Sequence, residues 1–490
     1  MRHRLASMLR TVGMLVIAAL LSGCPVGPSY ERPDLDPGQQ YGNQPSASFR
    51  ADPVLLNWWK QFRDPTLIRL IELAVKNNYD LQAAEANLRE ARALFIDAGL
   101  NLLPHITSRG SYNQLQRSLA ALNNRSFVPR NLNLYSVGFD TFWEVDIWGR
   151  VRRDIQSKEA EVQSAEAERR MVTLSVISEL ARNYMELRGH QNQMAVDVRN
   201  AKNQKETWEW TQARQEVGIG TEFDSSRAAA QYETTLALIP PQESQIRMDI
   251  HRISVLTGQI PSALLGELTT AASIPTEPPI VRIGDPASLL RRRPDIQMVE
   301  RQLASATARI GVATGDLFPR VTFIGSVNLE SASLTGLGAP GAGAYSFGPR
   351  ITWPALESFQ LYARLKGVEA HADANLATYK QTVLNALEET ENALVVYSRL
   401  MQRRALLKTA SDASYHAYEI GKARFDEGVD EFINLLDTER RLLLDQREYA
   451  ASQTETAAAL IAVYKALGGG WEVFQTPEDA QRPIETLFTP

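Results

Sequence analysis

Hydrophobic and polar residues alternate one by one along several short segments of the chain. The clearest segment places Tyr345, Phe347, Ile351 and Trp353 between Ser346, Gly348, Arg350 and Thr352. Similar alternation runs from Tyr135 to Glu144, from Val321 to Glu330 with an interruption at Ile324, and less regularly from Ile106 to Tyr112. A period of two predicts β-strands. We therefore expect four strands, at about residues 104–116, 132–146, 319–330 and 344–354, each near the roughly 10 residues that a tilted strand needs to cross a bilayer.

Two long segments instead have the composition of helices. Residues 150–215 and 359–425 contain no proline and are rich in Ala, Glu, Gln, Arg and Leu, which favour helices. A helix of roughly 65 residues is about 100 Å long, so neighbouring helices must stabilise it. Apolar residues at three- and four-residue spacing, such as Val172, Val176, Leu180 and Tyr184, suit that lateral packing. A coiled-coil stalk has the same pattern, so the helices alone do not indicate a channel.

The chain contains two copies of one arrangement of elements. Leu102-Leu-Pro104 recurs as Leu317-Phe-Pro319, and Trp143, Gly218 and Gly258 recur as Trp353, Gly428 and Gly468. Such internal similarity indicates repeats, and each copy is expected to contain a helix, two strands, a long helix, a turn and a second long helix. We place the first repeat at residues 63–272 and the second at 280–470. Residues 24–62 are expected to form an N-terminal lipidated anchor segment, and 471–490 a C-terminal tail.

The first 24 residues have the features of an export signal. Three arginines precede an apolar run from Met14 to Leu21, and Ser22, Gly23 and Cys24 follow. Leu21-Ser22-Gly23-Cys24 resembles the bacterial lipobox, which implies removal of residues 1–23 and a covalent lipid on Cys24; the alternative is an ordinary cleaved signal with a chance cysteine. By the rule known for such lipoproteins, Pro25 in place of aspartate favours the outer membrane. Cys24 is the only cysteine, which excludes an internal disulfide and a cysteine-based zinc site.

Neither the charge nor the motifs indicate nucleic-acid binding or catalysis. The 52 basic and 57 acidic residues leave no cationic excess for a phosphate backbone. The six histidines are scattered and form no metal motif. Gly336-Leu-Gly-Ala-Pro-Gly341 has dinucleotide-binding spacing, but Pro340 and the strand that follows favour a loop, and there is no Walker lysine motif. We therefore expect no enzyme activity, no metal, and no cofactor apart from the lipid on Cys24.

Four membrane strands in one chain predict an oligomer. No stretch after residue 24 has the roughly 18 apolar residues of a spanning helix, so a membrane crossing requires β-strands. Four strands cannot close into a barrel, because the smallest single-chain barrels have about eight strands. An unclosed sheet would leave open edges, which are not tolerated in lipid. Two copies give a sheet with a filled interior, whereas three give about twelve strands and an open interior. Passage of a molecule therefore favours three copies.

Several motifs resemble those of one transport family. Leu289-Leu-Arg-Arg-Arg-Pro-Asp295 is followed by Glu300-Arg-Gln-Leu303 and Asp316-Leu-Phe-Pro319, and Ile239-Pro-Pro-Gln-Glu243 leads to Val255-Leu-Thr-Gly258. In this order they resemble the TolC-type outer-membrane factors, specifically the NodT-like lipoprotein branch serving drug efflux systems of the RND type. The resemblance implies a mainly α fold with membrane β-strands, assembled as a homotrimeric α/β barrel. It also implies an anchor in outer-membrane lipid, a barrel spanning that membrane, helices in the periplasm, and two partners, a periplasmic adaptor and an inner-membrane RND pump.

The expected function is that of the outer-membrane channel of a tripartite efflux system, which exports drugs or other small molecules. A conduit for type I protein secretion or for nodulation-factor export would have the same fold and a different inner-membrane partner. A lipid-anchored envelope tether that does not conduct is a third possibility, but such a tether does not need alternating strands.

A periplasmic gate is expected at the two turns between long helices, residues 215–223 and 425–432. By the resemblance, the family's gate carboxylates match Phe432-Ile-Asn-Leu-Leu-Asp437, with Asn434 where one branch has an aspartate. We therefore expect Asp437, Asn434 and Leu435 at the gate, where three copies of an inward carboxylate would favour cations. Candidates for the ion pairs of the closed state are Arg424, Arg214 and Asp430, although charged turns are usually just solvated.

Overall fold

The computed structural model describes residues 25–42, 49–118, 120 and 130–474. The predicted signal and Cys24 lie outside these residues. The chain divides into two compact units, and each unit takes segments from both sequence repeats. Unit 1 consists of Met1–Pro33, Leu88–Ala165 and Val299–Lys380, and unit 2 consists of Asp34–Asn87, Glu166–Met298 and Gln381–Pro490.

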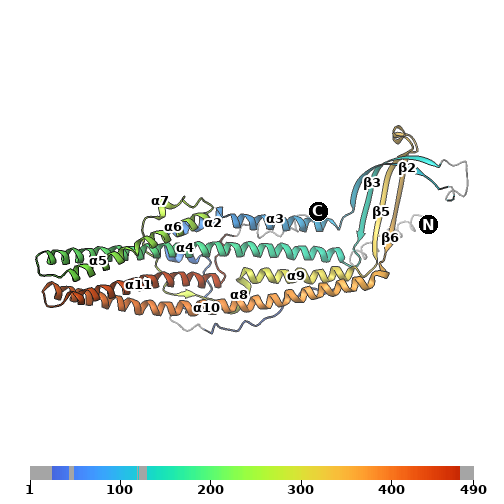
Figure 1. Cartoon of the computed structure of the whole chain (residues 1–490). Helices are drawn as coiled ribbons and strands as arrows, with labels where there is room; N and C mark the ends of the chain where they lie inside the picture. The colour runs from blue at the N-terminus through green and yellow to red at the C-terminus, as the bar shows by residue number, and fades with distance from the viewer. Residues whose placement is uncertain (1–24, 43–48, 119, 121–129, 475–490) are drawn as a thin grey trace. The chain divides into compact units, whose positions relative to one another are not determined.

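Helices dominate the described part of the chain (Figure 1). The long ones are α4 (Arg150–Glu216), α10 (Ser358–Asp426) and α11 (Phe432–Ala466); the shorter ones are α2 (Pro65–Asn77), α3 (Tyr79–Leu100), α5 (Glu222–Leu236), α6 (Ile239–Leu256), α7 (Leu265–Leu268), α8 (Pro286–Arg292) and α9 (Pro294–Gly315). The two predicted proline-free helices are thus confirmed as α4 and α10. None of the helices among the described residues is both long and apolar enough to cross a membrane.

Unit 1 contains a four-stranded antiparallel sheet in the order β2 (His105–Gln116), β3 (Asn131–Val145), β5 (Arg320–Ser331) and β6 (Gly343–Thr352) (Figure 1). The register pairs Tyr345 with Val327 and Val327 with Phe139, so alternate residues of neighbouring strands share a face. The large exposed residues of that face are Ile106, Tyr112, Val137, Phe139, Phe323, Val327, Leu329, Tyr345, Phe347 and Ile351. The opposite face is mainly polar. The four strands predicted from the alternation are therefore confirmed.

The polar face of this sheet also carries some apolar residues, among them Phe142 and Ile324. Phe142 of β3 is paired in register with Ile324 of β5. Apolar side chains opposite each other on adjacent strands stabilise a sheet by roughly 0.2–1 kcal/mol. Ile324, which interrupts the alternation, is therefore one member of a cross-strand pair and does not mark a break in the strand.

The second long helix of the first repeat is interrupted, which corrects the expected order of elements. Helix α5 ends at Leu236 and α6 begins at Ile239, whereas α11 of the second repeat is continuous. Pro240 lies in the first turn of α6, where the N–H that proline lacks has no helical partner. A helix can therefore begin at this proline pair but does not continue through it.

Within unit 2, the segments at the two ends of the chain meet in an aromatic core. The ring of Trp58 stacks on that of Tyr464 with centroids 4.9 Å apart, and its Nε1–H donates to the carbonyl of Gly469 at 3.0 Å. Trp59 stacks on Phe474 at 5.6 Å. The two short strands β1 (Phe49–Arg50) and β4 (Val281–Arg282) pair in parallel in the same unit.

Arg293 joins three helices of unit 2. Its guanidinium donates from Nη1 to the carbonyl of Ala466 at 2.9 Å, and from Nη2 to Asp295 at 2.8 Å and Glu389 at 2.6 Å. Arg293 is only 9% exposed. The start of α9 is thereby bonded to α10 and to the last residue of α11.

In unit 1, the first described residues run along the junction between β3 and α4. The N–H of Val26 donates to the carbonyl of Trp148 at 2.9 Å, and Arg153 donates to the carbonyls of Val26 and Gly27 at 3.1 Å each. Gly149 has a φ of 75°, and a Cβ there would lie 2.5 Å from Pro25. Glycine at position 149 therefore leaves the space that this segment occupies.

Candidate functional site

Unit 2 contains two helical turns, which join α4 to α5 and α10 to α11. Gly218 and Gly428 have φ angles of 79° and 75°, a left-handed conformation that glycine adopts without strain. The N–H of Ile219 donates to the carbonyl of Arg214 at 3.0 Å, and the N–H of Val429 donates to that of Arg424 at 2.9 Å. Both bonds are of the Schellman type. The glycines at equivalent positions of the two repeats therefore end both long helices in the same way.

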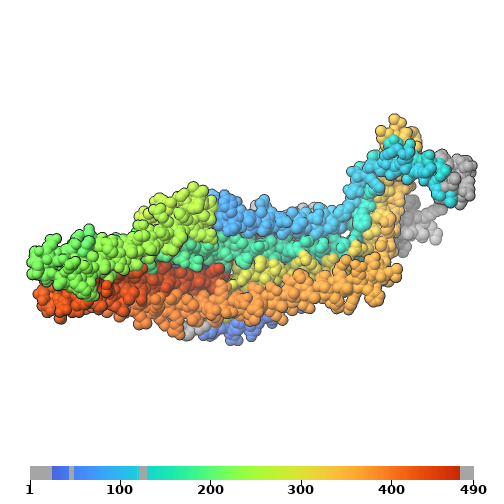
Figure 2. Space-filling view, in the orientation of Figure 1, coloured from blue at the N-terminus to red at the C-terminus, as the bar shows by residue number. Residues whose placement is uncertain are grey.

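Aromatic side chains pack the two turns against each other. Phe425 at the end of α10 meets Trp210 of α4 edge-on, with ring centroids 4.9 Å apart, and lies 5.7 Å from Phe432 of α11. The buried cluster around them comprises Ala228, Tyr418, Phe425, Phe432, Leu435, Leu436 and Leu442, with Trp208 packed against it. The space-filling view shows the turn of α4 and α5 lying directly on the turn of α10 and α11 (Figure 2). One core thus holds both turns.

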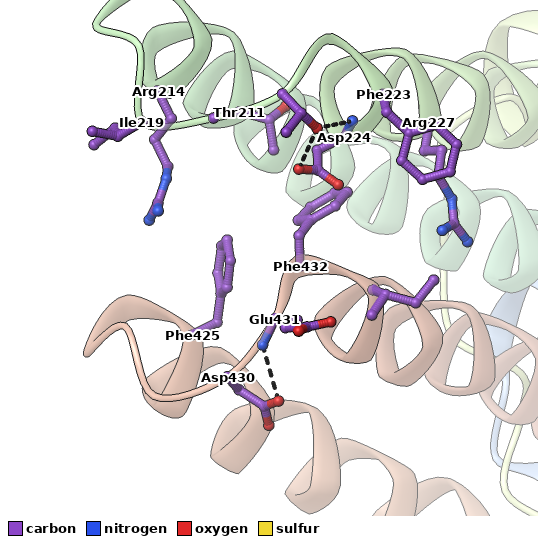
Figure 3. Close-up of a pocket in the computed structure, with 13 residues that line it drawn as sticks. Thr211, Arg214, Ile219, Phe223, Asp224, Arg227, Phe425, Asp430, Glu431 and Phe432 are labelled. Atoms are coloured by element: carbon purple, nitrogen blue, oxygen red, sulfur yellow. Dashed lines mark hydrogen bonds between the residues drawn. The ribbon is translucent and has the colours of Figure 1, made fainter.

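A pocket of about 530 Å³ lies between the turns (Figure 3). Its charged lining residues are Arg214, Asp224, Arg227, Asp430 and Glu431, and its large apolar ones are Ile219, Phe223, Phe425, Phe432 and Ile433. The side chains of Arg214 and Phe425 point toward each other (Figure 3). The guanidinium of Arg214 lies 4.9 Å from the ring centroid of Trp210 and 5.5 Å from that of Phe425. Cation–π attraction therefore positions Arg214, and no carboxylate among the described residues forms an ion pair with it.

Asp430 is bonded to two of the other candidate residues, Asn434 and Arg424. Its Oδ1 accepts hydrogen bonds from Nδ2 of Asn434 at 2.5 Å and from the N–H of Glu431 at 3.0 Å, and its Oδ2 lies 3.3 Å from Nε of Arg424. These donors, Asn434 foremost, lower the pKa of Asp430 below its ordinary value. The network is at the surface, where such ion pairs contribute little to stability. It can therefore hold the turn and also open at little cost.

Asp437 and Leu435 lie on different faces of α11. Asp437 is exposed, as is Asn434 one turn before it. Leu435 is 4% exposed and belongs to the buried cluster. Its side chain therefore supports the turn from within the chain. Of the three residues expected at the gate, Asn434 and Asp437 are the two whose side chains remain at the surface.

Sequence reasoning missed Trp210 and Glu439 as parts of this region, and it included Phe425 only as the first residue of an expected turn. The two aromatic residues form the contact between the turns, and Glu439 of α11 is 6% exposed. The aromatic contact could have been suspected from the sequence, because phenylalanines occur at the ends of both turns. A glutamate on a long charged helix has no sequence feature that marks it as buried. Within the described residues, no group of three or more His, Cys, Asp or Glu is placed to hold a metal ion.

The chain is similar to known outer-membrane proteins along most of its length. The family described as outer membrane efflux protein matches residues 70–259 and 286–469. Nodulation protein T of Rhizobium leguminosarum bv. trifolii is 30% identical over 453 residues, which cover 92% of this chain and 96% of that protein. The solvent efflux pump outer membrane protein SrpC of Pseudomonas putida is 29% identical over 474 residues, covering 93% and 97%. The solved structure of the outer-membrane channel OprN shares 38% identity at a TM-score of 0.86, covering 92% of this chain and 100% of that one. The chain therefore belongs to the outer membrane efflux protein family and is an outer-membrane efflux channel.

Proposed function

We propose that three copies of this chain form the outer-membrane conduit of a tripartite efflux system. The observation that supports this is the sheet of unit 1, whose edge strands β2 and β6 each pair on one side only among the described strands, and whose exposed face is apolar. Free N–H and C=O groups at such an edge cannot be satisfied by lipid. Pairing of β6 with β2 of the next copy satisfies them, and three copies enclose an interior lined by the polar face.

We propose a periplasmic adaptor and an inner-membrane pump of the RND type as partners. Apolar side chains at the two turns are unusually exposed: Val217 by 70%, Ile219 by 67% and Val429 by 65%. Exposed apolar residues that gather at one place favour a protein interface, and the charged residues of the adjacent pocket can fix its orientation. The turns are therefore the surface on which we expect the adaptor to dock, while the pump supplies the energy.

The aperture of the conduit is proposed at the same turns. In a threefold assembly, Asn434 and Asp437 on the exposed side of α11 would form rings around the axis. The ion pair of Arg424 with Asp430 holds Asn434 through its hydrogen bond to the same carboxylate. Loss of that pair should loosen the turn and favour an open aperture.

Single-channel conductance of the purified protein in planar lipid bilayers tests this proposal. The wild-type protein is expected to give discrete channel openings. The mass of the purified assembly should equal that of three chains. Arg424→Ala removes the exposed ion pair that holds the turn, so conductance should rise, and Asp437→Ala should also raise it by removing one charged ring. Asp412→Ala, an exposed carboxylate paired with Lys408 on α10, is the control and should change nothing. Unchanged conductance in both gate variants contradicts the gate, and a single chain without channels contradicts the conduit.

Small organic compounds are the cargo we propose, because the relative SrpC is named as a component of a solvent efflux pump. The relative named Nodulation protein T favours a second candidate, export of a nodulation signal. Deletion of the gene should lower the inhibitory concentrations of organic solvents and drugs several-fold, and the intact gene should restore them. Unchanged susceptibility together with loss of a secreted product would support the second candidate.

Cys24 is proposed as the lipid attachment site. Metabolic labelling with a radioactive fatty acid should label the wild type, and Cys24→Ser should abolish the label. The backbones of Val26 and Gly27 are hydrogen-bonded to Trp148 and Arg153 of the same unit, so the variant should still assemble when it is exported through a cleavable signal. A labelled Cys24→Ser protein would refute the assignment.

A further inference from the structure

A second pocket of unit 2, of about 610 Å³, lies between α4, α10 and α11. Four aromatic residues line it: Trp210, Tyr415, Tyr418 and Phe425. Phe425 also lines the pocket between the turns, so this side chain separates the two cavities. A volume of this size is within the range of roughly 300–1,000 Å³ that is typical of sites for small organic ligands.

The charged residues of the second pocket are mostly acidic. Glu206, Glu419, Asp426 and Glu439 line it together with one basic residue, Lys422. When all are ionised, four carboxylates against one ammonium group leave three formal negative charges. These charges act on Tyr418. Burial, and then the charges of Glu439, Glu206 and Asp426, raise the pKa of its hydroxyl to about 12. The interior of the pocket is therefore at negative potential.

Glu439 has an incomplete set of partners in this pocket. Its side chain is 6% exposed, and Oε1 accepts a hydrogen bond from the hydroxyl of Thr207 at 2.8 Å. Oε2 is buried and has no hydrogen-bond partner among the described residues. Burial raises the pKa of Glu439, the charge of Lys422 opposes this effect only in part, and no ion pair within 4.0 Å joins the two among those residues. A buried, unpartnered carboxylate oxygen is costly, and a positively charged ligand would satisfy it.

We propose that this second pocket binds an organic cation, a quaternary or protonated amine that carries aromatic or alkyl groups. The faces of aromatic rings attract cations, and the carboxylates neutralise the charge that enters. The apolar walls contributed by Trp210, Tyr418 and Phe425 suit substituents on the nitrogen. A cavity of about 610 Å³ is also much larger than a metal ion requires. The site is formed by one chain, so it does not depend on the proposed aperture.

Isothermal titration calorimetry of the full-length protein in lipid nanodiscs, with benzyltrimethylammonium as the probe, tests the site. Saturable binding of one cation per chain is expected, and benzenesulfonate should not bind. Glu439→Gln keeps the shape and removes the charge, so affinity should fall about tenfold. The matched control is Glu209→Gln, an exposed carboxylate of α4 that pairs with Lys205 and does not line the pocket. This control should bind the probe as the wild type does.

The pH dependence of probe binding gives a second readout. Burial raises the pKa of Glu439 to about 7, against the smaller effects of Thr207 and Lys422. Glu439 is therefore largely protonated at pH 6 and ionised at pH 8, and binding should tighten between them in the wild type but much less in Glu439→Gln. The other groups that line the pocket around it are Glu206 of α4, and Tyr415, Tyr418, Glu419, Lys422 and Asp426 of α10.

Three results would overturn the site: absence of saturable binding in the wild type, equal affinity of Glu439→Gln, or an equal loss in Glu209→Gln. If Glu439→Gln does not assemble, Glu206→Gln on the facing helix α4 provides the test. Its affinity for the probe should be at least threefold lower than that of the wild type. Conductance measured on the same preparation separates failure of this site from failure of the channel, since a conducting protein that does not bind the probe contradicts only the site.

Discussion

Phe347→Arg should prevent stable insertion of the protein into the outer membrane, whereas Ser346→Arg should be tolerated. Both residues lie near the middle of β6, and consecutive residues of a strand point to opposite faces. Phe347 belongs to the exposed apolar face and is itself 57% exposed, while Ser346 belongs to the polar face. An arginine facing lipid at the midplane of the bilayer costs about 2–4 kcal/mol per chain. In a threefold assembly that cost applies three times.

The measurement is the amount of folded, membrane-inserted protein, both in outer-membrane fractions and after refolding into lipid vesicles across a urea series. The neighbouring substitution is a strict control because it adds the same side chain one position away. Equal yields of the two variants would show that the apolar face does not contact lipid, and an equal loss would show that β6 tolerates no arginine on either face.

Arg293→Met should lower the stability of unit 2 by about 3 kcal/mol. Removal of one partner of a buried ion pair costs roughly 3–5 kcal/mol, and the lower end applies because the side chain of Glu389 is 48% exposed and can be hydrated. The carbonyl of Ala466 also loses its guanidinium donor and keeps only the hydroxyl of Thr390 at 3.3 Å. Methionine fills similar volume, so the change reports mainly the lost bonds.

The apparent Tm of the purified protein, measured at one fixed heating rate, checks this expectation, because membrane channels seldom unfold reversibly. Arg291→Met is the control, since Arg291 is an exposed residue of the same arginine run. Arg293→Lys should recover only part of the loss, because an ammonium group cannot reproduce the planar fork that reaches three acceptors. Similar Tm values for Arg291→Met and Arg293→Met would show that the network contributes little.

The elements of the fold could be predicted from the sequence because their periods are simple. Alternation located the sheet of unit 1, and freedom from proline located α4 and α10. The interruption before Pro240 was missed because a proline pair can begin a helix as well as break one. The pairing of Phe142 with Ile324 depends on register between strands about 180 residues apart, which no local pattern records.

The two helical turns at the candidate gate were predictable from the sequence, but the orientation of their side chains was not. Leu435 and Asp437 are two residues apart, and a helix rotates by about 200° over that interval, so one is buried when the other is exposed. Which of the two points inward depends on Phe425 and Phe432, which come from different helices. Likewise, three consecutive arginines do not reveal that Arg293 alone is buried.

The bonds that hold Val26 at the junction of β3 and α4 bear on how the sheet is set in the bilayer. Only two peptide steps separate Cys24 from Val26, a reach of about 7 Å at full extension. Acyl chains on Cys24 would therefore enter the inner leaflet immediately beside the base of the strands. Such short anchors would limit how far the assembly can rise or sink, and three of them would help to set the height at which the conduit meets the membrane surface.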